Sequence, residues 1–113
     1  MNQQLHTILL LPLLAAAAFT ASAHAADADG EAVVKKARCV ACHAVDAKRV
    51  GPAYKEVAAK YKGDAKAPAM LFDKVRHGGS GNWGQVPMIP HPADKISDDD
   101  LKAAIHWILS LDY

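Results

Sequence analysis

Five consecutive residues, Cys39-Val40-Ala41-Cys42-His43, constrain this chain more than any other feature. Two thiols three positions apart fall on one helical turn, so both sulfurs can reach the two vinyl groups along one edge of a haem. The imidazole that follows directly can then be carried under the ring, where it can bind iron. The pattern C-x-x-C-H is the signature of c-type haem attachment, so we expect thioethers at Cys39 and Cys42 and an iron ligand at His43.

Other uses of paired cysteines fit the rest of the chain less well. A structural zinc site usually needs four ligands, whereas Cys39 and Cys42 are the only two cysteines. A thioredoxin-like redox pair needs a preceding strand within a βαβ pattern, and the sequence shows neither. A disulfide between residues three positions apart would close a small, strained ring and leave His43 without a role.

The first 25 residues predict a secretory signal peptide that is removed from the folded domain. Residues 8–19 form an apolar run, and Ala23-His24-Ala25 is a small-residue cleavage site, so we expect cleavage after Ala25. The run is too short to span a bilayer as a helix, although the lack of Lys and Arg in residues 1–10 leaves an uncleaved anchor as an alternative. We expect residues 26–113 to form one exported, periplasmic domain, small enough to gain stability from a bound haem.

The formal net charge of +1 hides an uneven distribution of charge along the chain. Residues 35–76 hold eleven basic residues against four acidic ones, and the flanking segments are acidic. An ordinary solvated surface would account for this pattern. The functional interpretation is a positive face that steers acidic partners toward the protein and raises their association rate. Nucleic acid is a poor choice of partner because the chain is expected to be exported.

Caps and breakers in the first half of the domain predict two helices. Asp27 or Asp29 can cap a first helix that runs through Ala37 into the cysteine motif. Val50-Gly51-Pro52 breaks the chain. Residues 53–61 then form a second short helix.

The second half of the domain predicts two more helices, separated by a long loop. Pro68 is placed at the start of a third helix over residues 69–77, with four apolar residues facing inward and Gly78 ending it. Residues 78–92 are rich in glycine and proline and predict irregular structure. Ser97 and the three aspartates after it predict the start of a last helix with one inward apolar stripe. No stretch shows a strand period, so we expect an all-α fold. The inward residues expected on the third helix are Met70, Leu71, Phe72 and Val75.

The second axial position of the iron decides the function, and five side chains could fill it. Met70 lies among apolar residues of a predicted helix, where methionine is more often packing than ligand. His77 suits the negative end of a helix dipole and His106 suits an exposed position, so neither needs a metal. Met88 lies in the irregular loop between two prolines and has no packing explanation, so we expect it to bind the iron. His91 is the rival ligand, and could instead hydrogen-bond to the sulfur of Met88 or to a haem edge group.

Two further stretches, Val50-Gly51-Pro52-Ala53-Tyr54 and Gly81-Asn82-Trp83-Gly84-Gln85-Val86-Pro87-Met88, complete a family resemblance. Over essentially its whole length after the leader, the chain resembles the short bacterial class I cytochromes c of the c-551 type. The resemblance implies about four short helices wrapped around one covalently bound haem c. It implies that Pro52 accepts a hydrogen bond from the proximal histidine and that Trp83 bonds a haem propionate. It also implies that Met88 is the sixth ligand.

The chain departs from the family pattern at positions that carry neither a covalent nor an axial ligand. Arg38 stands where family members often have glycine before the first cysteine. His91 replaces an asparagine that commonly follows the ligand methionine by three residues, and Lys74 replaces an arginine that can contact a propionate. A few extra residues lie between Pro90 and Ser97.

A haem iron held by His43 and Met88 leaves no position for a substrate, so we expect an electron-transfer protein and not an enzyme. The expected function is a soluble periplasmic one-electron carrier. By the resemblance, it would run between a membrane cytochrome complex and a terminal reductase, oxidase or peroxidase. We expect redox partners with acidic surfaces at the haem edge, no membrane span and a monomer. The alternatives are a haem subunit permanently docked in a larger redox complex, and a haem sensor or peroxidase with a labile sixth ligand.

Overall fold

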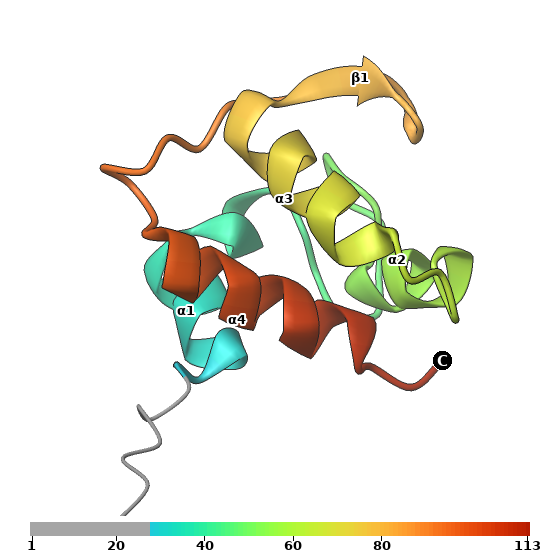
Figure 1. Cartoon of the computed structure of the whole chain (residues 1–113). Coiled ribbons are helices and arrows are strands. Elements are labelled where there is room, and N and C mark those ends of the chain that lie inside the picture. The colour runs from blue at the N-terminus through green and yellow to red at the C-terminus, as the bar shows by residue number, and fades with distance from the viewer. Residues whose placement is uncertain (1–27) are drawn as a thin grey trace, which may run out of the picture.

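The computed structural model describes residues 28–113, so the expected signal peptide, residues 1–25, lies outside the described residues. Four α-helices account for most of the regular secondary structure, as expected for an all-α chain (Figure 1). Within this part of the chain no helix is both long enough and apolar enough to cross a membrane. The elements in chain order are α1 (Gly30–Lys36), the 3-10 turn η1 (Cys39–Ala41), α2 (Tyr54–Lys60), α3 (Ala67–His77), β1 (Gly79–Gly81), β2 (Gly84–Met88) and α4 (Asp98–Leu109).

The helices α1 and α4 pack closely against each other, and this contact forms the centre of the core (Figure 1). Gly30 permits the close approach, because a Cβ there would collide with the carbonyl of Ala103 and the side chain of Trp107. Both α2 and α3 pack on α4 as well, so α4 contacts every other helix. The buried cluster consists of Val33, Val34, Tyr54, Ile96, Leu101, Ala104 and Ile105.

Side-chain caps begin the first and last helices at the residues that the sequence indicates. The Asp29 carboxylate accepts hydrogen bonds from the amides of Glu31 and Ala32, at 3.0 and 3.3 Å. The Ser97 hydroxyl accepts one from the amide of Asp100 at 3.2 Å. These oxygens satisfy amides that have no partner within the helix, so the predicted starts of α1 and α4 are confirmed.

The connection between α1 and the cysteine motif differs from the expected continuous helix. The helix ends at Lys36, and Arg38 adopts a left-handed conformation with φ = 61°. Among the described residues Arg38 is the one non-glycine residue with positive φ. Its left-handed backbone interrupts the helix and lets the chain re-enter a tight turn at Cys39. A glycine at this position would adopt the same conformation without strain, which gives a physical reason for the glycine that is common in the family.

The segment expected to be irregular contains a two-stranded antiparallel hairpin, so that prediction was wrong in part. The strand β1 pairs with β2 through Gly79 opposite Met88 and Gly81 opposite Gly84. These three glycines have φ values of 110°, 119° and 109°, which a side chain would strain. Both strands are largely exposed, so no alternation of apolar and polar residues marks them in the sequence. In Figure 1, β1 projects from the end of α3, away from α4.

The inner face of α3 differs from the expected one at Met70, whose side chain is 37% exposed. Leu71, Phe72 and Val75 are partly buried and pack against the core, as expected. The helix begins at Ala67, which is fully buried, with Pro68 in its first turn. Met70 lies one position outside this stripe, so the expectation that it faces the core was wrong.

Candidate functional site

The two cysteines share one tight turn, as their spacing predicts. The amides of Cys42 and His43 both donate to the carbonyl of Cys39, at 3.1 and 3.0 Å. Both thiols are free and half-buried, so neither is used in a disulfide. Arg49 reaches back to this turn and donates from its Nη1 to the carbonyl of Val40 at 3.4 Å.

The imidazole of His43 is oriented by a main-chain carbonyl. Its Nδ1 lies 2.8 Å from the carbonyl oxygen of Pro52. Because a carbonyl can only accept, Nδ1 must carry a proton and donate, and in the neutral ring this leaves the lone pair on Nε2. A metal-binding histidine is held in this way, with one nitrogen donating to the protein and the other available to the metal.

Backbone hydrogen bonds place the Pro52 carbonyl within hydrogen-bond distance of the imidazole Nδ1. The amide of Gly51 donates to the carbonyl of Cys42 at 2.8 Å, and the amide of Tyr54 donates to that of Ala44 at 2.9 Å. These bonds hold the chain on both sides of Pro52 next to residues 42–44. Gly51 leaves room for the ring, because a Cβ there would lie 2.8 Å from both ring nitrogens of His43.

Tyr54 is a site residue to which the sequence assigns no role of its own. Its ring stacks on the imidazole of His43, with centroids 5.0 Å apart and planes 13° apart, and it packs nearly perpendicular to the Trp107 ring, with centroids 6.1 Å apart. Burial raises the pKa of the Tyr54 hydroxyl well above its usual range. Burial also raises the pKa of the Cys39 thiol, although the hydrogen bond with Tyr54 partly offsets this effect. The signal that could have found Tyr54 is its place two residues after the proline of the Val50–Tyr54 stretch.

The hairpin carries the other two predicted site residues. Met88 ends β2 and is half-buried. Gly78, at φ = 68°, brings the end of α3 against this strand, because a Cβ there would collide with the carbonyl of Met88 and lie 2.9 Å from the nitrogen of Pro90. Trp83 lies in the turn between the strands and is half-buried, with the ammonium of Lys60 4.6 Å from its ring centroid.

The chain after Met88 is anchored to α3 through His91. Its amide donates to the carbonyl of Val75 at 2.9 Å, and its carbonyl accepts from Arg76 at 3.0 Å. Its ring Nδ1 is buried and has no hydrogen-bond partner, so the structure has no hydrogen bond from this nitrogen to the sulfur of Met88. Buried polar atoms are rarely left unpaired, so this nitrogen fits a site that receives a further polar group.

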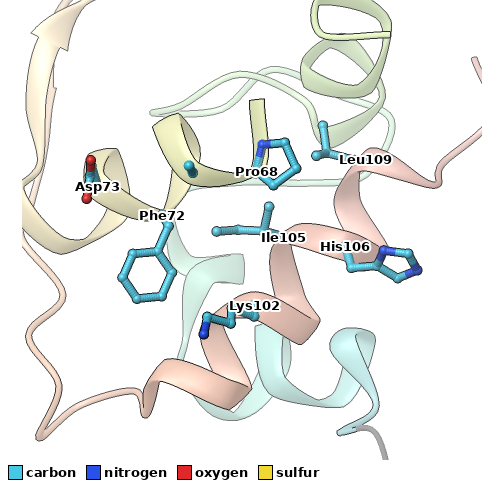
Figure 2. A pocket seen from close by; sticks show the side chains of 8 residues that line it. Pro68, Phe72, Asp73, Lys102, Ile105, His106 and Leu109 are labelled. Atoms are coloured by element: carbon cyan, nitrogen blue, oxygen red, sulfur yellow. The ribbon is translucent and has the colours of Figure 1, made fainter. Parts of the chain in front are cut away.

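The remaining candidates do not assemble a second site within residues 28–113. His77 and His106 are exposed, and the Nδ1 of His77 is 3.0 Å from the carbonyl of Asp73 in its own helix. No three His, Cys, Asp or Glu side chains in this part of the chain lie close enough to share a metal ion. A cavity of about 440 Å³ opens between α3 and α4, lined by Phe72 and Ile105 (Figure 2). It contains none of the residues predicted to hold a haem.

The donor set fits a covalently bound haem c. Two free thiols lie on one turn, an imidazole beside them keeps Nε2 available, and Gly51 provides the space that this imidazole occupies. Thiol, imidazole and thioether groups are the ones that proteins use to bind and ligate haem of this type. The structure therefore brings Cys39, Cys42, His43 and Pro52 together in one cluster, and it places Trp83 and Met88 on the hairpin.

Comparison with known proteins agrees with this arrangement. Residues 28–112 match the model of the family described as cytochrome c. Cytochrome c-551 of Allochromatium vinosum is 52% identical over 95 residues, which cover 83% of this chain and 99% of that protein. Cytochrome c-551 of Pseudomonas aeruginosa is 46% identical over 101 residues, with 89% and 93% covered. The crystal structure of Nitrosomonas europaea cytochrome c552 superimposes with a TM-score of 0.65 at 45% identity and covers 73% of this chain and 99% of that chain. These matches confirm the resemblance and the small class I fold, and the chain belongs to the cytochrome c family, whose members carry covalent haem c and transfer electrons.

Proposed function

We propose that this cytochrome is a soluble periplasmic carrier that shuttles single electrons between a membrane cytochrome complex and a terminal reductase, oxidase or peroxidase. The observation that carries this proposal is the fixed orientation of His43. Its Nδ1 lies 2.8 Å from the carbonyl of Pro52, Tyr54 stacks on its ring, and the backbone of Gly51 lies close against the ring. An imidazole held from three directions keeps its position through a redox cycle, which lowers the barrier to electron transfer.

Four side chains bind the cofactor in this proposal. Cys39 and Cys42 form the two thioethers, and His43 presents Nε2 to the iron. Met88 supplies the sixth ligand through its sulfur, a soft donor that favours the ferrous state and raises the reduction potential. When bound, the haem supplies the one-electron iron couple. With His43 and Met88 both bound to the iron, these residues would leave no position there for a substrate.

Two more residues orient the cofactor. The carbonyl oxygen of Pro52 accepts a hydrogen bond from the Nδ1–H of His43, which leaves Nε2 as the nitrogen that would face the iron. Trp83 donates its indole N–H to a haem propionate, a role that the resemblance implies. Its half-buried position in the hairpin turn is compatible with an indole that has one face against the protein and an N–H available for bonding.

The surface around the cysteine turn suits brief docking of an acidic redox partner. Val40 and Val50 are 45% and 54% exposed, so this surface presents two apolar side chains. Arg38 and Arg49 lie in the same two segments, and both are exposed. A small apolar surface with basic neighbours favours fast, salt-sensitive association with an acidic partner and quick dissociation of the complex. We infer that the carrier works as a monomer and exchanges electrons through this edge.

Export to the periplasm completes the proposal. Residues 1–25 serve as the signal peptide, with cleavage after Ala25, and residues 26–113 form the monohaem domain. An oxidising compartment outside the cytoplasm also suits the attachment of haem to Cys39 and Cys42.

Visible spectroscopy of the purified periplasmic protein tests this function directly. The ferric form should show the weak red charge-transfer band of sulfur bound to iron, and the ferrous form should not bind carbon monoxide. Ready binding of carbon monoxide would contradict the carrier and support a sensor or peroxidase with a labile sixth ligand. Size-exclusion chromatography of the same sample should give a monomer. Co-purification in a stable large complex would support a docked subunit instead.

A further inference from the structure

The position of Trp83 is not determined by the hairpin alone. The strands β1 and β2 are exposed along most of their length and pack mainly against each other. Their glycines at 79, 81 and 84 all have positive φ and give the backbone little intrinsic stiffness. A side chain that must aim an N–H at one carboxylate therefore needs support from outside the hairpin.

Lys60, the last residue of α2, provides two contacts to the hairpin turn. Its Nζ donates to the carbonyl of Asn82 at 3.3 Å. The same Nζ lies 4.6 Å from the centroid of the Trp83 ring, well within the range of a cation–π interaction. One ammonium thus holds both the backbone before Trp83 and the face of its ring, across 22 residues of sequence.

The ammonium of Lys60 is directed to the hairpin rather than to an acidic side chain. The ion pairs within residues 28–113 are Lys35–Glu31, Lys55–Asp46 and Arg76–Asp98, and none includes Lys60. Its charge is therefore not neutralised by a neighbouring carboxylate. A cation over an indole face draws electron density from the ring and makes the N–H at its edge a stronger donor.

We propose that Lys60 is a positioning residue of the electron-transfer site, which ties the hairpin turn to the end of α2 and fixes the Trp83 ring so that the indole N–H meets a haem propionate. This proposal rests on the role given to Trp83 above. It has an electrostatic consequence, because a positive charge beside the propionate offsets the negative charge that stabilises the ferric state. Loss of the Lys60 charge should lower the reduction potential, and it should make the Trp83 ring more mobile, so that its indole N–H exchanges faster.

The chain contains a matched control. Lys62 lies two residues further on, and its Nζ is 5.2 Å from the ring centroid of Tyr113. It makes the same kind of contact with a ring that lies outside the hairpin. Lys62→Gln therefore removes the same charge from the same end of α2 without touching Trp83.

The test compares Lys60→Gln, Lys60→Arg and Lys62→Gln as haem-loaded proteins. The first readout is the hydrogen-exchange rate of the Trp83 indole N–H by NMR, and the second is the reduction potential as a function of pH. We expect exchange at least tenfold faster in Lys60→Gln, together with a lower potential and a shifted propionate titration. Lys60→Arg should restore both readouts, because a guanidinium also stacks on an indole, and Lys62→Gln should stay within about twofold of the parent rate. Equal effects of Lys60→Gln and Lys62→Gln would overturn the proposal.

A fourth variant, Trp83→Phe, separates this proposal from the one on which it depends. The phenyl ring keeps a face for Lys60 but has no N–H. If Trp83→Phe leaves the pH dependence of the potential unchanged, the propionate role of Trp83 fails, and the role of Lys60 fails with it. If Trp83→Phe shifts that dependence and Lys60→Gln does not, the role of Lys60 alone is refuted.

Discussion

Replacement of Gly51 by alanine should be the most informative single perturbation of the proximal side of the site. An added Cβ would lie 2.8 Å from both Nδ1 and Nε2 of His43, a distance that Cβ atoms do not tolerate. The backbone at Gly51 has little freedom to retreat, because its amide is bonded to the carbonyl of Cys42 at 2.8 Å. The ring must therefore move, and it must lose its hydrogen bond to Pro52.

The expected change in the free energy of unfolding of Gly51→Ala is the sum of two destabilising effects and one stabilising effect. Overpacking a close-fitting site costs about 1–3 kcal/mol. Loss of the hydrogen bond from Nδ1 costs about 0.5–1.5 kcal/mol more. Alanine also lowers the conformational entropy of the unfolded chain, which stabilises the folded state by about 0.4–1 kcal/mol. The free energy of unfolding should fall by about 2–3 kcal/mol, which for a domain of this size lowers Tm by roughly 10–20 °C.

Thermal unfolding of the ferric haem-loaded protein, followed by far-ultraviolet circular dichroism, measures this loss. Gly63→Ala is the matched control, because nothing lies within 4 Å of the Cβ it adds. Its cost comes from the φ of +74° alone and should be about 1 kcal/mol. NMR should also show faster exchange of the His43 Nδ1 proton in Gly51→Ala only. An unchanged exchange rate, with a Tm no lower than that of the control, would refute the steric argument.

Three other substitutions test separate parts of the structure. Met88→Ala should leave the haem attached but open the iron, so the ferrous protein should bind carbon monoxide and the potential should fall; an unchanged spectrum would exclude Met88 as ligand. Arg38→Gly should raise the free energy of unfolding by about 0.5–1 kcal/mol in urea titrations, because glycine adopts φ = 61° without strain; a loss of stability would show that the arginine side chain contributes more than its backbone costs. Arg76→Met should lower stability by about 2–4 kcal/mol in the same titration, because Arg76 bonds the carbonyls of His91 and Ile96 at 3.0 and 2.7 Å. Asp98→Asn, which keeps both carbonyl bonds, should cost less than about 1 kcal/mol, and equal losses in the two variants would contradict this account.

The helices could be predicted from the sequence because their signals are local. Asp29 and Ser97 bond amides two or three residues away, so the information that begins each helix lies beside it. The apolar stripe of α4 is equally local, and its residues enter the core as the period indicates. The cysteine turn belongs to the same class, since one carbonyl accepts two amides within four residues.

The hairpin and the role of Tyr54 depend on distant parts of the chain, and the sequence signals for them are weak. Three glycines with positive φ are compatible with an irregular loop and with a hairpin alike. Neither strand has a buried face, so the sequence shows no alternation of apolar and polar residues there. Tyr54 reaches His43 only because the chain folds back on itself through Gly51. At Arg38 the sequence does give a signal, because an arginine stands where glycine is common in the family. The reason for that glycine becomes clear only from the structure, in which Arg38 has a positive φ.

The two sides of the proposed haem site are supported in different ways. His43 belongs to a tight turn, and the carbonyl that orients it is held by main-chain bonds that no side-chain substitution removes directly. Met88 lies on an exposed hairpin, and its surroundings depend on side chains and on one glycine: Gly78 permits the approach of the strand, Arg76 holds the chain beyond it, and Lys60 holds the turn before it. If Met88 binds the iron as proposed, substitutions on its side should change the ligand field gradually, whereas those around His43 should disturb the fold itself. On the proposed ligand set, the reduction potential should therefore be adjusted mainly through the hairpin and the three residues that support it, Lys60, Arg76 and Gly78.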